Sequence, residues 1–303
     1  MKIIFGPVNS RRFGLSLGVD LSAGGKQCNF DCVYCELRAA KPVREQKNVV
    51  AVGEILAELE DYLERGVAFD ILTLTANGEP SLYPHLKELI LALKNRVRDK
   101  KILILSNGTA VLDADKFEAL LELDVVKFSL DSAIERTFFR IDRALRGIDL
   151  NLMVEKMAEF GQKFRGELVM EVLVVAGLND KEEEFLALNE ALRKIAPLRV
   201  DLSTLDRPPA YAVRAVSEER LVELSWLIDS VPVLISRRQY GGRRLRFSEE
   251  ELLKMLALRP QSEMDVEASF DADSKRILSK LLAQGRVRTV SLAGVRFYGA
   301  YLG

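Results

Sequence analysis

The sequence predicts an α/β protein built on a parallel β-sheet. Over the first two hundred residues, short apolar runs alternate about six times with segments of helical periodicity. Because parallel strands need a crossover, usually a helix, this alternation indicates repeated βα units. Six units can form a doubly wound sheet or a partial (β/α)6 barrel, and both place their chemistry at the carboxyl ends of the strands. A chain of 303 residues is long enough to bury the core that either fold needs.

Each predicted strand is a short apolar run that ends at a polar or glycine-containing turn. The six strands are expected at Ser16–Asp20, Asp70–Leu74, Lys101–Leu105, Val125–Leu130, Leu168–Val175 and Leu198–Ser203. The intervening helices show apolar residues three or four positions apart, as in Ile55, Leu59 and Leu63. They are expected at Gly53–Arg65, Tyr83–Val97, Asp113–Leu121, Asn151–Phe164, Asp180–Ile195 and Ser217–Ser230, the last with Ser217 as its N-cap.

The βα rhythm breaks after about residue 247. The pattern there predicts a helix with Ser248 as N-cap, a short second segment, a third helix that Gly285 ends, and two strands: Ser248–Leu258, Ser262–Ala268, Asp271–Gln284, Arg286–Val290 and Val295–Ala300. This order predicts a small winged-helix-like domain at 248–303. We expect the α/β domain at 1–235 and a basic linker at 236–247.

Charge is distributed unevenly along the chain. The formal net charge is −1, but residues 233–303 hold 13 Lys+Arg and 8 Asp+Glu, a net of +5. The densest basic stretch, Ser236–Arg246, contains five arginines and one tyrosine. Such a stretch can bind phosphate groups, or it can be a solvated linker.

The N-terminus lacks the apolar core of a signal peptide, and no run is long and apolar enough to span a membrane. We therefore expect a cytoplasmic protein without a membrane partner. Its 3 cysteines all lie between Cys28 and Cys35. In a reducing compartment, clustered cysteines indicate a metal or redox role rather than disulfides.

The cysteines follow the first predicted strand with the spacing Cys-x3-Cys-x2-Cys, as Cys28, Cys32 and Cys35. Three thiolates on one short loop can ligate three irons of a cubane cluster and leave the fourth iron open, whereas four-cysteine clusters serve electron transfer. A zinc site would need a fourth ligand, and the single histidine, His85, is about fifty residues away. Three inert buried cysteines are the remaining alternative.

The cysteine loop, with Tyr34 just before its third cysteine, resembles the signature of the radical S-adenosylmethionine (SAM) superfamily. Together with Gly6-Pro7, Ser10–Asp20 and Asn77–Pro80, it looks like the group related to the tRNA wyosine-base synthetases, over roughly residues 5–235. The resemblance implies a partial barrel, a [4Fe-4S] cluster on the three cysteines, and SAM as second cofactor. It also implies an electron donor such as flavodoxin or ferredoxin. Those synthetases carry a second cluster, for which this chain has no cysteines.

The resemblance implies that the other strand ends hold SAM. Asn77, Gly78 and Glu79 occupy the position of the family's Gly-Gly-Glu motif, where Glu79 and backbone carbonyls can accept from the SAM ammonium. Ser106 and Asn107 are expected near the methionine carboxylate or the ribose. Ser129 or Asp131 is expected at the ribose hydroxyls or the SAM carboxylate, with a helix N-cap as the alternative for Asp131. Asn179 is expected to fix the turn that faces adenine. Arg12 and Arg207 are candidates for holding an anion.

In the superfamily, one electron from the reduced cluster cleaves SAM to methionine and a 5′-deoxyadenosyl radical, which abstracts hydrogen from a substrate. The basic tail and the winged-helix pattern favour RNA or tRNA as that substrate. A radical-installing activase or modifier of a protein or peptide is the alternative. A third interpretation is a non-catalytic iron–sulfur regulator that binds DNA, and such a protein would not cleave SAM.

Overall fold

The computed structural model describes the whole chain apart from residues 1, 11, 23, 236–242, 293 and 301–303. An eight-stranded sheet, with its strands in chain order from β1 to β8, forms the larger part of the molecule. Strand β1 pairs antiparallel with β2, and all later neighbours are parallel. The strands are β1 (Ile4–Ser10), β2 (Gly14–Asp20), β3 (Ile71–Thr75), β4 (Lys101–Ser106), β5 (Val125–Ser129), β6 (Glu167–Val174), β7 (Arg199–Thr204) and β8 (Val233–Ile235).

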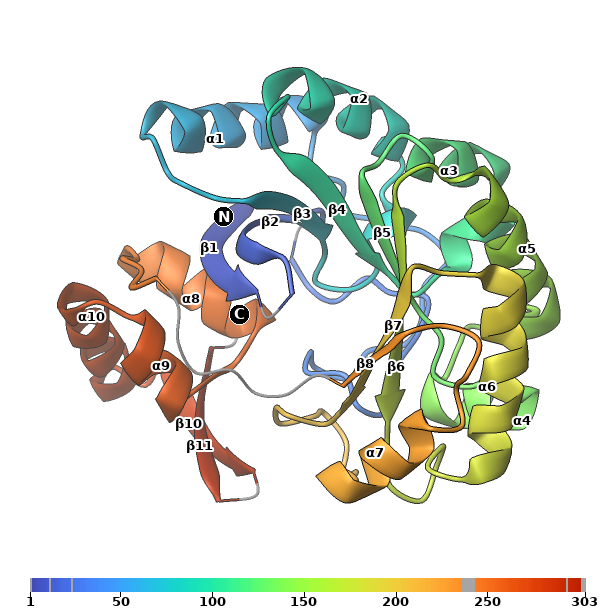
Figure 1. Ribbon diagram of the computed structural model, residues 1–303. Coiled ribbons are helices and arrows are strands. Elements are labelled where there is room, and N and C mark those ends of the chain that lie inside the picture. Colours follow the sequence, from blue (N-terminus) through green and yellow to red (C-terminus); the bar gives the residue numbers. More distant parts are fainter. Residues whose placement is uncertain (1, 11, 23, 236–242, 293, 301–303) are drawn as a thin grey trace.

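Helices cover the convex face of this curved sheet (Figure 1). Because one apolar stripe of each helix meets the outward-facing side chains of the strands, strands and helices share one large core that includes Leu17, Leu72 and Phe160. The helices are α1 (Val52–Glu64), α2 (Leu86–Arg96), α3 (Ala114–Leu120), α4 (Glu135–Ile141), α5 (Leu150–Lys163), α6 (Glu182–Ile195) and α7 (Glu218–Ser225), with short 3-10 turns η1 (Pro80–Leu82) and η2 (Thr109–Leu112).

All six predicted parallel strands are present, as β2 to β7, and the sheet is an open partial barrel in the described residues. The sheet has one more strand at each edge than the sequence predicts. Strand β1 precedes the first predicted strand, and the three-residue β8 follows the last. Pro7 lies inside β1, which is an edge strand where a missing backbone donor is tolerated. Helix α7 ends at Ser225, five residues earlier than expected, although Ser217 caps it as predicted.

The C-terminal part contains α8 (Glu249–Leu258), β9 (Gln261–Ser262), α9 (Glu263–Ser269), α10 (Ala272–Ala283), β10 (Val287–Leu292) and β11 (Val295–Ala300). Ser248 caps α8 in a reciprocal capping box with Glu251, which confirms the predicted helix start. The strands form a small antiparallel sheet in the order β10-β11-β9. Its core also takes in Leu15 of β2, so this C-terminal unit packs directly on the barrel edge.

The expected linker is described only from Arg243 onward, so most of the arginine-rich stretch lies outside the described residues. Its described end belongs to the C-terminal unit. Leu245 and Phe247 are buried in that unit's core, and the Phe247 amide donates to Ser274 Oγ at 2.9 Å. No helix within the described ranges is long and apolar enough to cross a membrane.

Candidate functional site

The three cysteines lie on the loop that connects β2 to α1, at the carboxyl end of the barrel. Backbone hydrogen bonds hold this loop against the turn after β3, the end of α4 and the segment after β7. Gln27 N donates to Asn77 O at 2.9 Å, Val33 N donates to Ile141 O at 2.8 Å, and Ala210 N donates to Cys35 O at 2.8 Å. The loop is therefore fixed from several sides although its described residues form no helix or long strand.

The three thiols share one partly buried environment. Burial, followed by the nearby Glu79, raises the pKa of Cys28 to about 12. Burial and the Asp142 carboxylate raise the pKa of Cys32 well above its ordinary value, and burial also raises the pKa of Cys35. Each thiol lies close enough to at least one other to affect its pKa. Because metal ligation needs the thiolate form, cluster binding releases the protons of these thiols.

This donor set fits a cubane cluster better than a single ion. Within the part of the chain that the structure describes, no three His, Cys, Asp or Glu side chains are placed to hold one metal ion together. Thiolates of a cubane each bind a different iron and need not converge on one point. His85 is an exposed residue at the N-terminus of α2, so it supplies no fourth ligand.

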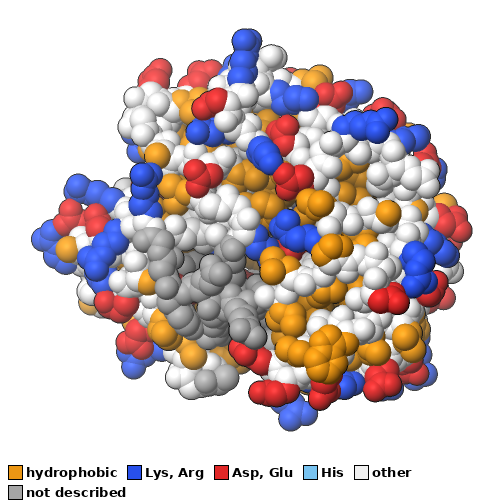
Figure 2. Space-filling model, in the orientation of Figure 1, with side chains coloured by type: hydrophobic (Ala, Val, Ile, Leu, Met, Phe, Trp, Pro, Cys, Tyr) orange, Lys and Arg blue, Asp and Glu red, His pale blue; other side chains and the backbone are white. Residues whose placement is uncertain are grey.

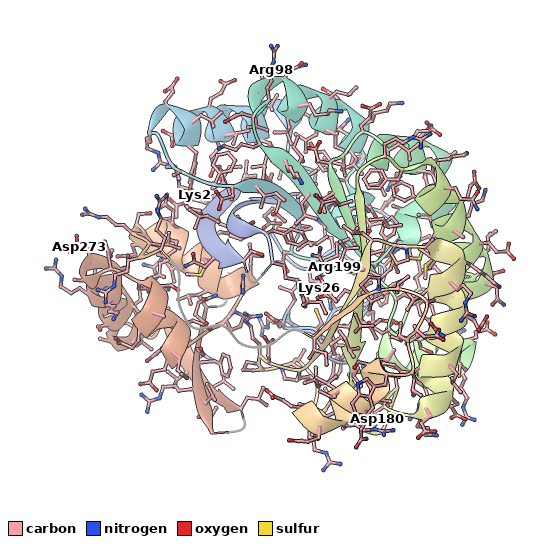
Figure 3. The ribbon with its side chains drawn as sticks, viewed as in Figure 1. Lys2, Lys26, Arg98, Asp180, Arg199 and Asp273 are labelled. Atoms are coloured by element: carbon pink, nitrogen blue, oxygen red, sulfur yellow. The ribbon has the colours of Figure 1, made fainter. Side chains whose placement is uncertain are left out.

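Lys26 is a buried cation beside the cysteines. Its side chain is 4% exposed, and Nζ lies 3.1 Å from Asp31 Oδ1. Burial opposes its charge, but Cys35, Asp31 and Cys28 together raise its pKa above the ordinary value. Figure 3 shows Lys26 inside the curve of the sheet, in contrast to the peripheral Lys2, Arg98 and Asp273. A permanent positive charge therefore lies next to the proposed iron ligands.

Asn77, Gly78 and Glu79 form the turn after β3 and pack on the cysteine loop. Glu79 is buried and accepts from the Ser81 amide, the Ser106 hydroxyl and the Asn107 amide at 2.9, 2.7 and 2.8 Å. Burial raises its pKa, although these donors oppose the shift. The structure thus brings Glu79, Ser106 and Asn107 together, with the Glu79 carboxylate directed at the protein's own donors.

Asn107 links this turn to the cysteine loop. Its Nδ2 donates to Asn29 Oδ1 at 2.7 Å, and its Oδ1 accepts from the Thr109 hydroxyl at 2.8 Å. Asn29 Nδ2 in turn donates to Thr109 Oγ1 at 2.8 Å. The polar groups that follow β4 therefore form a closed network with the residue next to Cys28.

A second network lies on the other side of the cysteines. The Tyr34 hydroxyl donates a short hydrogen bond to Asp131, and Cys32 Sγ donates to Asp142 Oδ1 at 3.4 Å. Burial raises the pKa of both carboxyls, which lie close together. The alternative of Asp131 as a helix cap is wrong, because Ile134 occupies the N-cap position of α4. Asp142 was missed by sequence reasoning, since it follows a short helix rather than a strand.

Asn179 fixes the turn after β6. Its Nδ2 donates to Asp131 O and Leu173 O at 2.7 and 2.9 Å, and its Oδ1 accepts from the Val175 amide at 2.8 Å. Ser129 ends β5 beside Glu171 of β6 and is partly exposed. The predicted site residues thus all lie at one end of the barrel.

A cavity of about 450 Å³ opens inside the barrel below the cysteine loop. Tyr34 and Cys35 border one side of it, while Leu258 and Arg259 of the C-terminal unit border another. Its volume lies in the range of small-molecule sites, roughly 300–1,000 Å³. The C-terminal unit therefore forms part of the wall of this cavity.

Charged side chains from β5, β6 and β7 form an ion-pair cluster with Arg12 beside the cavity. Lys127 Nζ lies 2.7 Å from Glu171 Oε1 and 3.3 Å from Asp201 Oδ2, and Arg12 contacts the same two carboxylates at 3.3 and 3.1 Å. Burial raises the pKa of Glu171, but Lys127 and Arg12 outweigh it and keep the pKa low. Arg12 is therefore paired with the protein's own acids. Arg207 likewise pairs with Glu36 and Asp206 and donates to Pro260 O at 3.0 Å.

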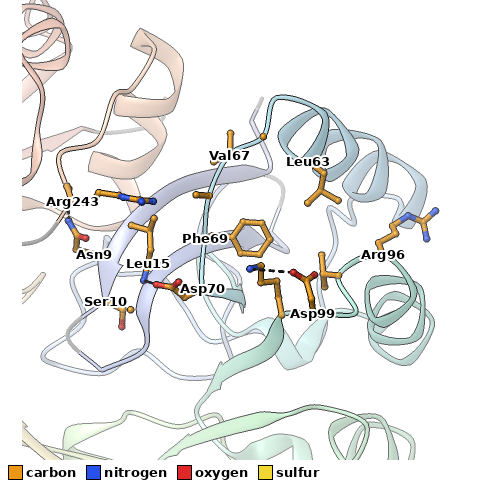
Figure 4. Close-up of a pocket in the computed structure, with 15 residues that line it drawn as sticks. Asn9, Ser10, Leu15, Leu63, Val67, Phe69, Asp70, Arg96, Asp99 and Arg243 are labelled. Carbon is orange, nitrogen blue, oxygen red and sulfur yellow. Dashed lines mark hydrogen bonds and ion pairs between the residues drawn. The ribbon is translucent and has the colours of Figure 1, made fainter.

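A wider hollow of about 920 Å³ lies elsewhere, at the amino end of β2 (Figure 4). Asp70 accepts from the Leu15 amide there at 2.6 Å, and Asp99 pairs with Lys100 at 3.4 Å. Because barrel chemistry occurs at the carboxyl ends of strands, we assign the site to the smaller cavity beside the cysteines.

A three-thiol loop at the carboxyl end of an open parallel barrel defines a class of protein. The sequence profile of the Radical SAM superfamily matches residues 24–188, more than half of the chain, and the chain therefore belongs to this superfamily. The superfamily uses a [4Fe-4S] cluster and SAM, which confirms both expected cofactors.

Within the superfamily, the chain is 38% identical to the UPF0026 protein of Helicobacter pylori (strain J99) over 304 residues. That match spans 99% of this chain and 98% of the relative. The UPF0026 protein of Methanocaldococcus jannaschii is 27% identical over 98% of this chain and 96% of its own length. A GTP 3′,8-cyclase of Chlorobaculum tepidum is 27% identical over 56% of this chain and 49% of that enzyme.

Two solved structures share the fold. A radical SAM methyltransferase from Sphaerobacter thermophilus superposes with a TM-score of 0.57 at 16% identity, over 73% of this chain and 66% of that one. Streptococcus suis SuiB, bound to its precursor peptide, gives 0.57 at 15% identity, over 74% of this chain and 49% of that one. At these identities the likeness shows the fold alone.

Proposed function

We propose that this protein cleaves SAM reductively and uses the resulting 5′-deoxyadenosyl radical to abstract hydrogen from a substrate. The observation that carries the proposal is the loop of Cys28, Cys32 and Cys35 at the edge of the barrel cavity. These residues would hold the [4Fe-4S] cluster, which supplies the electron for cleavage and an open iron for SAM. A flavodoxin or a ferredoxin is the proposed electron donor.

The surrounding residues hold and shield SAM. The turn of Asn77, Gly78 and Glu79 presents backbone carbonyls beside the cysteine loop, and Glu79 fixes that turn against Asn107. Ser106, Ser129 and Asp131 are proposed to face the ribose and methionine portions. Tyr34 and Asn179 keep Asp131 in place through their hydrogen bonds. The apolar part of the cavity wall, which includes Phe5, Leu103 and Leu173, helps to exclude water from the radical.

We propose RNA, with tRNA as its first candidate, as the substrate. The order of α8, β9, α9, α10 and the β10–β11 hairpin supports the proposed winged helix, and the C-terminal region is basic. A base extruded from RNA fits a cavity of this size. The name of the Chlorobaculum relative, a GTP cyclase, is consistent with nucleotide chemistry. The alternative is a protein or peptide, as in the peptide-bound SuiB.

The decisive experiment is anaerobic reconstitution with iron and sulfide, followed by reduction and measurement of 5′-deoxyadenosine. The wild type is expected to form it, and Cys28→Ala, Cys32→Ala and Cys35→Ala are expected to form none. Lys181→Ala, an exposed substitution on the outer face, is the matched control. 5′-Deoxyadenosine formation that survives a cysteine substitution would refute the proposal. A reduced cluster that leaves SAM intact would also refute it, and that result fits a non-catalytic iron–sulfur regulator.

RNA binding is tested separately by retention of tRNA at increasing salt. Phosphate contacts predict steep weakening with salt, because bound counterions are released. Retention at low salt that disappears in a variant lacking 248–303 supports RNA. If neither the full chain nor the variant lacking 248–303 retains tRNA, RNA is contradicted as the substrate and the peptide alternative remains.

A further inference from the structure

The last residue of β2, Asp20, is a buried carboxylate whose two oxygens serve different parts of the molecule. Only 1% of the Asp20 surface is exposed to solvent. Asp20 Oδ1 accepts from the Asn77 amide at 2.8 Å and from the Ser22 amide at 3.0 Å. It therefore fixes both the start of the cysteine loop and the start of the turn after β3.

The other oxygen, Asp20 Oδ2, pairs with Lys254 Nζ of α8 in the C-terminal unit. The Lys254 side chain is 2% exposed, although lysine is almost never fully buried without a partner. The same helix contacts the barrel again through Glu251, which accepts from the Tyr62 hydroxyl at 2.9 Å. Through Lys254, helix α8 is thus anchored to the carboxyl end of β2, where the cysteine loop begins.

A buried ion pair is weak evidence for stability alone, because desolvating both charges offsets their attraction. This ion pair also acts on the turn after β3, because Asp20 accepts from the Asn77 amide. From Asn77 the contacts continue to the iron-ligand loop: Gln27 N donates to Asn77 O, and Glu79 N donates to Gln27 O, both at 2.9 Å. Gln27 directly precedes Cys28 in the chain.

This contact is too tight to adjust locally. A Cβ at Gly78 would lie 1.9 Å from Gln27 O, so the two backbones touch without an intervening side chain. A displacement of Asn77 must therefore also displace Gln27 or break their hydrogen bonds. Through Asp20, the position of Lys254 is coupled to the backbone that we propose holds SAM.

We propose that Lys254 of the C-terminal unit is a positioning residue for SAM binding. It neutralises and orients Asp20, which holds Asn77 and Ser22 so that the turn of Asn77–Glu79 presents its carbonyls correctly. The inference rests on the proposed function, since it takes SAM to bind at this turn. It also explains why α8 contributes both this anchor and, through Leu258, a wall of the cavity.

The test measures SAM affinity in the reconstituted holoenzyme by anaerobic equilibrium dialysis. Lys254→Met is expected to weaken SAM binding about tenfold, as substitutions behind a ligand shell commonly do. We expect the KM for SAM to rise by the same factor in 5′-deoxyadenosine formation while kcat changes less. The change that SAM causes in the electron paramagnetic resonance signal of the reduced cluster should need correspondingly more SAM. Lys254→Arg, which keeps the charge, should restore most of the affinity.

The matched control is Lys280→Met, which removes an exposed pair with Glu249 in the same unit and should leave SAM affinity unchanged. If Lys254→Met does not fold, Lys254→Gln keeps a donor toward Asp20 and is expected to show a smaller loss of affinity. Wild-type SAM affinity in the folded Met or Gln variant would overturn the inference. Failure of the wild type to cleave SAM would instead count against the proposed function, so the two failures are distinguishable.

Discussion

The Glu79 carboxylate accepts a 2.8 Å hydrogen bond from the Asn107 amide and thereby joins the turn after β3 to the turn after β4. In a Glu79→Gln variant, one side-chain N–H group must face a donor of Ser81, Ser106 or Asn107. We expect a loss of about 1–3 kcal/mol in the free energy of unfolding, because a buried group loses its partner. Urea denaturation measures this loss, and Glu88→Gln, an exposed substitution on α2, should stay within about 0.5 kcal/mol of wild type. Equal midpoints for wild type and Glu79→Gln would contradict the structural role.

Two glycines with positive φ allow the contact at the cysteine loop to be tested against backbone strain alone. Gly78 has φ 136° and touches Gln27, whereas Gly66 has φ 65° and open space around it. Gly66→Ala should cost only the strain of the left-handed region, about 1–2 kcal/mol. Gly78→Ala adds a backbone clash, so it should destabilise more and also reduce the iron bound per chain after reconstitution. If both variants bind the same amount of iron, the contact does not support the cluster loop.

Glu171 predicts a specific pH dependence of stability. Although burial acts to raise its pKa, Lys127 and Arg12 lower it below the ordinary value of 4.5. A carboxyl whose pKa is lower in the folded state contributes stability above its unfolded pKa and loses it as pH falls through the folded value. Glu171→Gln should therefore be less stable than wild type at pH 7, by about 1–3 kcal/mol, and the gap should narrow below about pH 4.5.

Thermal unfolding of both proteins between pH 7 and pH 3 measures this gap. Glu159→Gln, on α5, is the control and should give a much smaller difference, since solvent screens its pairs with Lys156 and Lys163, whose side chains are 42% and 52% exposed. A gap at Glu171 that stays constant over the whole range would show that its ionised form is not what stabilises the barrel.

The cluster should order the segment that carries its ligands. The segment 21–51 connects β2 to α1 and has no helix or long strand among its described residues, and Arg44 and Lys47 on it are exposed and are not followed by proline. Removing iron with a chelator should speed tryptic cleavage at these positions, because metal binding contributes directly to local folding. Mass spectrometry of the fragments over time measures the effect, and cleavage at Lys163, the exposed last residue of α5 at the amino end of β6, should not change.

The sequence predicted the regular part of the fold well, because each parallel strand is a short apolar run that ends in a turn. It missed β1 and β8 because edge strands are short or interrupted, as β1 is by Pro7. The cysteines were found because their spacing is local. Asp142, Asp20 and Lys254 were not, because their partners are distant in sequence: Asp20 and Lys254 are 234 residues apart.

Some of the missed residues did leave a signal. Lys127, Glu171 and Asp201 are charged residues in the interior of otherwise mostly apolar strands, and they pair with one another inside the barrel. In a strand buried on both faces, a single charge indicates an internal partner or a ligand. Trp226, the C-cap residue of α7, is 76% accessible and shows the opposite case. Figure 2 shows hydrophobic side chains gathered over α7. No pattern in the sequence neighbourhood of Trp226 distinguishes it from a buried residue of a helix.

Lys26 predicts a measurable property of the cluster itself. A buried cation next to the iron ligands favours the reduced cluster, which carries one more negative charge. Lys26→Met should therefore make the reduction potential more negative, and Lys26→Arg should restore it most of the way. A redox titration followed by electron paramagnetic resonance measures the potential without any substrate. Lys41→Met removes an exposed lysine of the same loop and should leave the potential unchanged, because water screens its charge. Equal potentials for Lys26→Met and Lys41→Met would show that the buried charge does not act on the cluster.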